Sequence, residues 1–227
     1  DSNQLCIMFE FLIDEKDNYN YNRKVSLNAI RLSQIVKDTI SPKALVIGGG
    51  VFGLTSAIEL SNNGYLVDVK EKSNTIMGGA SSINQYRLHK GYHYPRSKET
   101  AQECLDGLYS FKRKYQDCVV NGDITHMYSI ASEDSLISGD EYKEFLDDMK
   151  LSYEEREPMP NCDLTVVADE ELFCPKKLTE SLEKKIQSSY INVELNTEVI
   201  DLEYWKKEYD VVVIATYSDI NQLLDDK

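Results

Sequence analysis

The sequence has few of the patterns that mark membrane, secreted or metal-binding proteins. No apolar run reaches the roughly 18 residues that cross a membrane, and the start has no basic flank of the kind found in signal peptides. The five cysteines lie far apart and form no Cys-x-x-Cys pair, which argues against a disulfide framework or a zinc site. We therefore expect a protein of a reducing, cytoplasmic location, with no membrane contact and no bound metal.

Positive charge is also scarce. The chain has 39 acidic against 25 basic residues and a net charge of −14, and the phosphates of a nucleic acid repel such a surface. The densest basic run, Lys112-Arg113-Lys114, falls on a predicted helix, where a solvated face accounts for it. Nucleic acid is therefore not an expected partner. The sequence indicates no particular oligomeric state.

The first forty residues differ in pattern from the rest of the chain. Residues 1–41 contain a predicted strand over 5–13 and a predicted helix over 26–40, and Ser41-Pro42 ends the segment. We interpret them as an N-terminal extension or the tail of an upstream domain. Because the sequence of 227 residues does not begin with Met, we expect a fragment or a processed product of a longer chain.

A glycine-rich turn directly follows an apolar strand. The run Lys43–Ile47 leads into Gly48-x-Gly50-x-x-Gly53, and residues 51–63 then show helical periodicity. In this context the first glycine permits a tight turn, and the second lets a pyrophosphate approach the backbone. The third lets the helix pack closely against the sheet. Strand, turn and helix together predict a dinucleotide-binding site.

The next strand supplies the acidic residue that such a site requires. Residues 66–70 form this predicted strand, and Glu71-Lys72 follows at about the expected spacing of 20 residues from the turn. The Glu71 carboxylate is suited to accept hydrogen bonds from ribose hydroxyls and to repel a 2′-phosphate, which argues against NADP. The helix that begins near Val51 and Phe52 directs its free N–H groups at the phosphates.

The remainder of the chain alternates helical and extended patterns. Its last run, Asp210–Thr216, is apolar on both faces, as is typical of a buried parallel strand. We expect this strand in the middle of a sheet, beside Lys43–Ile47. The other predicted elements are helices over 97–117, over 140–150 and from Pro175 onward, and strands over 126–131, 161–167, 191–195 and 198–203.

A further motif identifies the dinucleotide. A nicotinamide domain would continue after Glu71 into another helix and strand, but here Gly78-Gly79-Ala80-Ser81-Ser82-Ile83-Asn84 follows. Together with the glycine turn, this segment resembles the FAD-dependent oxidoreductases of the D-amino-acid oxidase superfamily. The run from Asn84 to Tyr94 resembles the L-2-hydroxyglutarate dehydrogenase branch, and Ser81-Ser82 with Arg87 resembles the sarcosine oxidase branch. The resemblance implies that the cofactor is FAD.

Two later segments resemble the same superfamily. Asn196-Thr197-Glu198-Val199 is similar to the segment that passes the adenine, and Ile214-Ala215-Thr216 is similar to the strand end near the pyrophosphate. Tyr217 stands where the family has glycine, which puts close cofactor approach there in doubt. The resemblance extends from about Lys43 to Leu224. Its members run well beyond this length, which also indicates a fragment.

The resemblance implies a fold and a domain organisation. We expect an α/β protein whose Rossmann-like FAD-binding domain, built on a parallel sheet, comprises residues 42–120 and 170–227. Residues 121–169 are expected to form part of an inserted substrate domain with a mixed or antiparallel sheet. The cofactor-binding residues that it implies are Gly48, Gly50, Val51, Phe52, Gly53, Glu71, Lys72, Gly79, Ser81, Ser82, Asn84, Val199, Ala215 and Thr216.

Three residues are candidates for catalysis. His89, by its place in the motif, is the first candidate for the base that takes a proton from the substrate N–H or O–H, and His93 is the next. Arg87 carries a planar guanidinium group that suits a substrate carboxylate. The alternative for each is packing beside the cofactor or a contact with phosphate or solvent.

The function expected from these features is that of an FAD-dependent oxidoreductase, either an oxidase or a dehydrogenase. It would oxidise a C–N or C–OH bond of a small molecule and pass the hydride to the flavin. A flavin-dependent mutase or isomerase without net redox stays open, as does a non-catalytic FAD-binding fragment. A nicotinamide dehydrogenase is disfavoured by the segment from Gly78 to Asn84.

Overall fold

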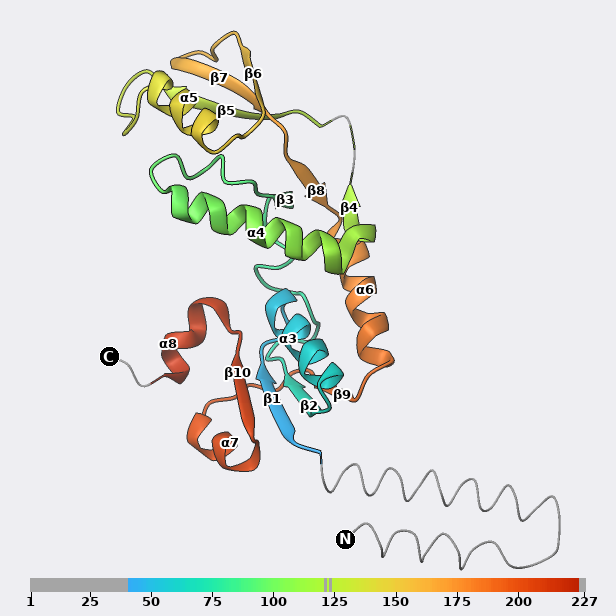
Figure 1. Ribbon diagram of the computed structural model, residues 1–227. Helices are drawn as coiled ribbons and strands as arrows, with labels where there is room; N and C mark the ends of the chain where they lie inside the picture. The colour runs from blue at the N-terminus through green and yellow to red at the C-terminus, as the bar shows by residue number, and fades with distance from the viewer. Residues whose placement is uncertain (1–40, 121, 123, 225–227) are drawn as a thin grey trace, which may run out of the picture.

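The computed structural model describes residues 41–120, 122 and 124–224 and arranges them in three tiers (Figure 1). A parallel sheet with its helices forms the lowest tier. Above it lie the long helix α4 (Lys98–Tyr115) and a small antiparallel sheet, and a second antiparallel sheet with one helix forms the top. The predicted α/β fold class is confirmed. The strand and helix predicted before residue 41 lie outside the described residues.

The parallel sheet has the strand order β10-β1-β2-β9. Its strands are β1 (Lys43–Ile47), β2 (Leu66–Lys70), β9 (Ile191–Glu194) and β10 (Val211–Ile214). Strands β1 and β10 pair in parallel from Ala44 opposite Val211 to Ile47 opposite Ile214, as the sequence predicted. The predicted central position of the last strand is wrong. Within the described residues β10 lies at the end of the sheet, so its residues are only half-buried.

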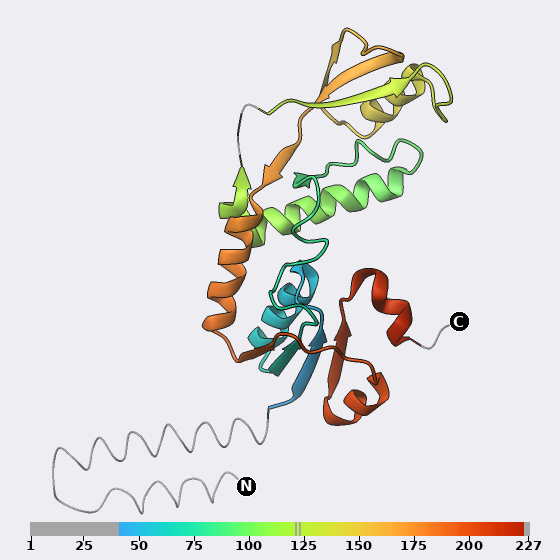
Figure 2. The same cartoon turned by 180° about the vertical axis from the view of Figure 1, so that it is seen from behind.

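Helices cover both faces of the parallel sheet (Figure 2). They are α3 (Val51–Asn62), α6 (Pro175–Gln187), α7 (Leu202–Glu208) and α8 (Ile220–Leu223), with the short 3-10 helix η2 (Tyr217–Asp219) before α8. Successive side chains of β1 point to opposite faces. Ala44 and Val46 pack in one cluster with residues of α3 and α6. Leu45 and Ile47 pack on the other face, with α7.

The strand predicted over 198–203 is wrong, because this stretch is a loop that leads into α7. The Asp201 carboxylate caps the helix by accepting a hydrogen bond from the Tyr204 N–H at 3.0 Å. Leu202 and Trp205, three positions apart and so on one side of a helix, pack against the sheet. Capping and burial together therefore favour a helix here.

Two antiparallel sheets form the upper tiers. The middle sheet has the order β3-β8-β4, with β3 (Arg87–Leu88), β8 (Glu171–Phe173) and β4 (Val119–Val120). The top sheet has the order β5-β7-β6, with β5 (His126–Ala131), β7 (Cys162–Ala168) and β6 (Tyr153–Arg156), and α5 (Gly139–Asp148) packs on it. The sequence predicted β5, β7 and α5. Strands β3, β4, β6 and β8 were missed. Strands β3, β4 and β8 have only two or three residues, and β6 reads Tyr-Glu-Glu-Arg, which has neither an apolar run nor alternation.

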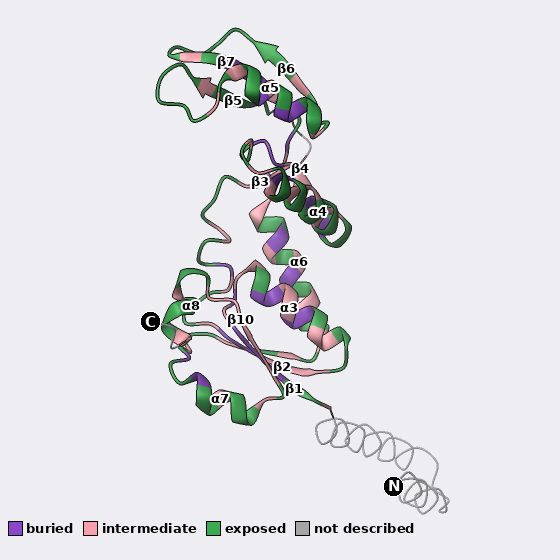
Figure 3. Cartoon of the chain, turned by 60° about the vertical axis from the view of Figure 1, so that its left-hand side comes forward, coloured by how far each residue is buried: buried purple, intermediate pink, exposed green. Residues whose placement is uncertain are grey.

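The loop after β3 joins the middle and top tiers. The ribbon is coloured as buried in parts of this loop and of α5 (Figure 3). Tyr92 from the loop belongs to one hydrophobic cluster with residues of α5 and the top sheet. The Tyr92 ring stacks on Tyr128 of β5 at a centroid distance of 5.4 Å. Gly91 has φ +99°, and a Cβ there would lie 2.7 Å from the Cβ of Ala101 on α4. Close packing on two sides therefore determines the path of the loop that carries His89 and His93.

Candidate cofactor and catalytic site

A cavity of about 700 Å³ lies where β1 and β2 end, and residues of the glycine turn form part of its wall. In an open parallel sheet this edge is where ligands bind. Most of the predicted cofactor residues line it, namely Gly48, Gly50, Val51, Phe52, Glu71, Lys72, Gly79, Ser81, Asn84, Val199, Ala215 and Thr216. Gly53 and Ser82, also predicted, are not part of its lining. The fold thus brings together segments that are far apart in the sequence.

The three glycines of the turn differ in what surrounds them. Gly48 has φ +108°, and a Cβ there would lie 2.4 Å from the carbonyl oxygen of Ala215. A Cβ at Gly53 would lie 1.9 Å from the carbonyl oxygen of Gly48. At Gly50 the added atom would meet only the Ser81 Oγ, at 3.0 Å. The first and third glycines are therefore required by the packing of the protein itself, whereas the second leaves space on the cavity side.

Glu71 supports the turn as well as lining the cavity. Its Oε2 accepts a hydrogen bond from the Gly49 N–H at 2.6 Å, and its Oε1 accepts one from the Ser73 N–H at 2.7 Å. Each carboxylate oxygen has a second lone pair. Glu71 can therefore hold the glycine turn and accept a ribose hydroxyl at the same time, although the sequence predicted only the ribose contact.

Polar groups in the cavity fit a phosphate-containing ligand. The Oγ1 of Thr216 is buried and has no hydrogen-bond partner among the described residues. Helix α3 begins after Gly50 without a side-chain cap and without an acidic residue in its first turn. The Val51 N–H donates to the Ser81 Oγ at 3.0 Å. A helix start whose N-cap residue is a glycine without a capping side chain, beside an unsatisfied hydroxyl, is suited to bind the pyrophosphate of a dinucleotide.

The cavity wall holds an ion pair that the sequence did not predict, next to Tyr217, which the sequence placed near the cofactor. The Lys72 ammonium donates a hydrogen bond to the Asp219 carboxylate, which raises the pKa of Lys72. Both residues line the cavity, so the pair links the end of β2 to η2. Tyr217 lines the rim with φ +55° and with 82% of its surface exposed. Asp219 lies beyond the last predicted strand, where the sequence has no motif to indicate it.

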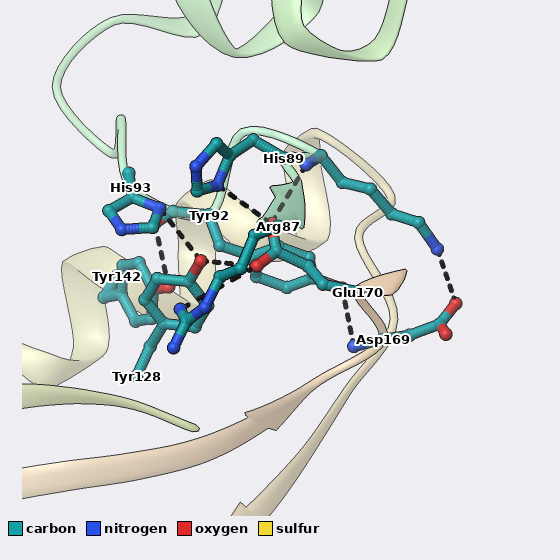
Figure 4. A network of polar contacts seen from close by, with 9 residues as sticks. Arg87, His89, Tyr92, His93, Tyr128, Tyr142, Asp169 and Glu170 are labelled. Atoms are coloured by element: carbon teal, nitrogen blue, oxygen red, sulfur yellow. Dashed lines mark hydrogen bonds and ion pairs between the residues drawn. The ribbon is translucent and has the colours of Figure 1, made fainter. Parts of the chain in front are cut away.

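The three candidate catalytic residues meet around an acidic side chain that the sequence did not single out (Figure 4). Glu170 lies between β7 and β8, and its side chain is fully buried. The Nδ1 of His89 lies 3.7 Å from its Oε1, and the guanidinium of Arg87 lies 4.0 Å from its Oε2. The rings of His89 and His93 stand edge to face with their centroids 4.6 Å apart.

Hydrogen bonds hold the Glu170 carboxylate on both sides. Its Oε1 accepts from the Lys90 N–H at 3.0 Å, and its Oε2 accepts from the Tyr128 hydroxyl at 2.6 Å. The Tyr128 oxygen also lies 2.9 Å from the Nδ1 of His93. Arg87 lies over the Tyr128 ring at 5.5 Å from its centroid. One buried carboxylate is therefore connected to every predicted catalytic residue.

The charges of this cluster follow from burial and from these contacts. Burial disfavours ionised Glu170, but favourable contacts from His89, Tyr128 and the Lys90 N–H outweigh it and bring the pKa of Glu170 to about 2. Burial, and secondarily the nearby His89, lowers the pKa of His93. Burial and the hydrogen bond to Glu170 raise the pKa of Tyr128. At neutral pH the cluster thus holds a carboxylate, a neutral His93 and a protonated phenol.

The same side chains include potential metal ligands. His89, His93 and Glu170 bring ligand atoms within 4.8 Å of one another. A divalent cation there would face the guanidinium of Arg87, and Glu170 already accepts hydrogen bonds on both oxygens. The absence of a metal stays a prediction.

The parallel sheet, the glycine turn and the cavity at the strand ends define a dinucleotide-binding α/β protein. A family model described as FAD dependent oxidoreductase matches residues 43–226. The chain belongs to this family, whose cofactor is FAD. The family assignment agrees with the segment from Gly78 to Asn84, part of which lines the cavity.

Two named relatives agree with this assignment. The chain is 37% identical over 91 residues to the FAD-dependent monooxygenase kojA of Aspergillus flavus, a match covering 40% of this chain and 21% of that protein. It is 31% identical over 122 residues to the FAD-dependent monooxygenase FPY4 of Fusarium mangiferae, covering 52% and 32%. The matches thus span less than a third of either relative.

The fold is similar to that of glycine oxidase from Geobacillus kaustophilus. The TM-score is 0.56 at 17% identity, and the match covers 71% of this chain and 48% of that one. At this identity the likeness concerns the fold. Among the described helices, none combines the length and the apolar character needed to cross a membrane.

Proposed function

We propose that the chain carries the FAD-binding part and some of the substrate side of an enzyme that oxidises a C–N or C–OH bond of a small molecule. The observation that carries the proposal is the His89–Glu170 cluster, a few residues along the chain from Asn84 on the cavity wall. FAD, when bound, accepts the hydride. The scattered cysteines support a reducing location such as the cytoplasm.

The roles of the cavity residues follow from their positions. The start of α3 and Thr216 would hold the pyrophosphate, and Glu71 would accept a ribose hydroxyl. Val199 would lie by the adenine, and the segment from Gly79 to Asn84 by the flavin. The Nε2 of His89 would take the proton from the substrate as its hydride leaves, while Arg87 would hold a substrate carboxylate.

Monooxygenation is the second candidate function, and the names of the two fungal relatives support it. The two functions differ in what reduces the flavin. The flavin of an oxidase or dehydrogenase is reduced by the substrate. The flavin of a monooxygenase with an external reductant, such as NADH or NADPH, takes its hydride from that reductant. Anaerobic mixing of the full-length protein with amino acids and 2-hydroxy acids, and separately with NADH or NADPH, distinguishes them by loss of flavin absorbance.

We predict that the full-length protein carries FAD rather than NAD. The cavity has a carboxylate at Glu71 for the ribose and an uncapped helix start for the pyrophosphate, and the segment from Gly79 to Asn84 provides a wall for the flavin. Heat release followed by chromatography identifies the cofactor. Recovery of NAD, or of no flavin after supplementation with FAD, would contradict the prediction.

We predict that His89→Asn slows reduction of the flavin by substrate without weakening FAD binding. General base catalysis contributes roughly 10²–10⁴-fold, and His89 is not part of the cavity lining. Stopped-flow absorbance measures the rate, with any amino acid or hydroxy acid that reduces the wild type. Asp169→Asn is the matched control, since Asp169 is a neighbouring acid with an exposed side chain. A variant as fast as the wild type would remove His89 from this role.

A further inference from the structure

We propose that Glu170 is a positioning residue, one that fixes His89 and His93 in the tautomer with the proton on Nδ1 and leaves each Nε2 as a free lone pair. The inference rests on the proposed function, because it states how His89 is prepared to act as a base. Glu170 itself acts through the two rings, and it lies buried behind them (Figure 4).

The proton on His93 follows from the hydrogen-bonding capacity of its neighbours. Ionised Glu170 can only accept, so the bond of 2.6 Å between its Oε2 and Tyr128 uses the single hydroxyl proton of Tyr128. The second bond of that hydroxyl, 2.9 Å to the Nδ1 of His93, then requires the proton to come from His93. Because burial keeps His93 neutral, its other nitrogen, Nε2, is unprotonated.

The proton on His89 follows from electrostatics. Its Nδ1 is buried, lies 3.7 Å from the Oε1 of Glu170 and has no hydrogen-bond partner within the described part of the chain. A lone pair on that nitrogen would face the lone pairs of a carboxylate, whereas an N–H is attracted by it. The distance is longer than a hydrogen bond, so the preference for a proton on Nδ1 is electrostatic.

The carboxylate can serve both rings because other groups hold it in place. The Lys90 N–H and the Tyr128 hydroxyl hydrogen-bond to it and hold it in a buried position, with the guanidinium of Arg87 4.0 Å from its Oε2. One oxygen faces His89 directly, and the other reaches His93 through Tyr128. A carboxylate that orients an imidazole in this way determines which nitrogen is available as the base. The guanidinium of Arg87 lies 4.0 Å from the same carboxylate and would repel a cation, which favours orientation of the histidines over metal binding.

The test is Glu170→Gln in the full-length, FAD-loaded protein. Glutamine keeps the shape, and its oxygen must stay on the Lys90 N–H beside His89, so its amide nitrogen takes the place of Oε2 and donates to the Tyr128 hydroxyl. The Tyr128 proton then turns to the His93 Nδ1, and His89 faces a neutral oxygen in place of a charged one. Nitrogen-15 NMR of the imidazoles distinguishes the two tautomers, and the His89→Asn spectrum assigns the signal. We expect Nδ1–H for both rings in the wild type. In the variant we expect Nε2–H for His93 and a mixture of tautomers for His89, with flavin reduction slowed in proportion to the Nε2–H fraction of His89.

The controls separate orientation from simple loss of structure. Asp169→Asn removes a neighbouring exposed acid and should change neither tautomer nor rate. Tyr128→Phe removes the hydroxyl that bonds both the Glu170 Oε2 and the His93 Nδ1, so the His93 tautomer should become mixed. The Glu170 Oε1 is still held by the Lys90 N–H, so His89 should keep Nδ1–H. If Glu170→Gln does not fold, the His93 tautomer in Tyr128→Phe tests whether the carboxylate acts on this ring through Tyr128.

Two results would overturn the proposal. One is a wild type in which His89 carries its proton on Nε2. The other is a Glu170→Gln variant, or a Tyr128→Phe variant if the first does not fold, whose tautomers equal those of the wild type. If instead the tautomer shifts as expected but His89→Asn leaves the rate unchanged, the positioning role stands and the proposed base role fails.

Discussion

Valine in place of Gly50 is expected to give a folded protein that does not bind FAD. A Cβ at this position meets only the Ser81 Oγ, at 3.0 Å, and a serine side chain can rotate away. The remaining atoms of the valine would occupy the cavity where the pyrophosphate approaches the backbone. Titration with FAD, followed by flavin fluorescence, should show no saturable binding. The thermal unfolding midpoint of the apoprotein should stay close to that of the wild type.

Alanine in place of Gly53 is the matched comparison, and its main effect should be on stability. Its Cβ would lie 1.9 Å from the Gly48 carbonyl oxygen, which is backbone and cannot rotate away. Helix α3 would have to shift from the sheet and disturb the packing of Leu54 and Ala57. We expect a loss of about 3 kcal/mol or more in the free energy of unfolding, measured on the apoprotein with denaturant.

Glu71→Ala should weaken FAD binding without abolishing it, in contrast to Gly50→Val. It removes the ribose acceptor, worth roughly 1.5–3 kcal/mol of binding when one partner is charged. It also frees the Gly49 N–H that holds the turn. If Gly50→Val and Glu71→Ala bound FAD equally well, the pyrophosphate would not lie on the glycine turn.

Acid is expected to destabilise the protein through Glu170. The pKa of this carboxyl is about 2 in the fold, against an ordinary value of 4.5, so its contribution is present above pH 4.5. It is lost as the pH falls toward 2, because the unfolded chain binds the proton more readily. Each pKa unit corresponds to about 1.4 kcal/mol, which puts the total loss on the order of 3 kcal/mol.

Several charged or titratable groups face Glu170, and they determine the pH range over which the free energy of unfolding must be measured. They are Arg87, His89, the Lys90 N–H and Tyr128, with His93 behind Tyr128. Burial lowers the pKa of His93, so its protonation removes stability as the pH falls below 6.5, before Glu170 titrates. The free energy of unfolding should therefore be measured from pH 7 to 2 for the wild type and for Glu170→Gln.

The variant should lose less stability between pH 4.5 and pH 2. Above that window the two curves also differ, because the Glu170 charge raises the pKa of His93 and of His126. The other carboxylates are the same in both proteins, so the difference below pH 4.5 reports mainly Glu170. Equal losses below pH 4.5 would mean that the Glu170 pKa is not depressed in the folded protein.

Much of the nucleotide site was determined by the sequence alone. The strand, the glycine turn, the helix and Glu71 lie within one short stretch, and each has a local physical signature in apolar runs, glycine spacing and an acidic strand end. The hydrogen bond from the Gly49 N–H to Glu71 spans only 22 positions. The long elements α4, α5 and α6 were predicted for the same reason, since their periodicity is local.

The cluster of candidate catalytic residues was decided by the tertiary structure. Glu170 lies 80 positions from Lys90 and 42 from Tyr128, and no local pattern distinguishes it from the other acidic residues around it. It reaches the motif histidines because β8 pairs with β3 and β7 pairs with β5, a pairing that depends on how short strands meet across long loops. The pair of Lys72 and Asp219 spans 147 positions for the same reason. The sequence thus determined the glycine turn and Glu71 as cofactor-binding residues. Long-range strand pairing decided that the buried carboxylate of Glu170 lies against His89 and, through Tyr128, against His93.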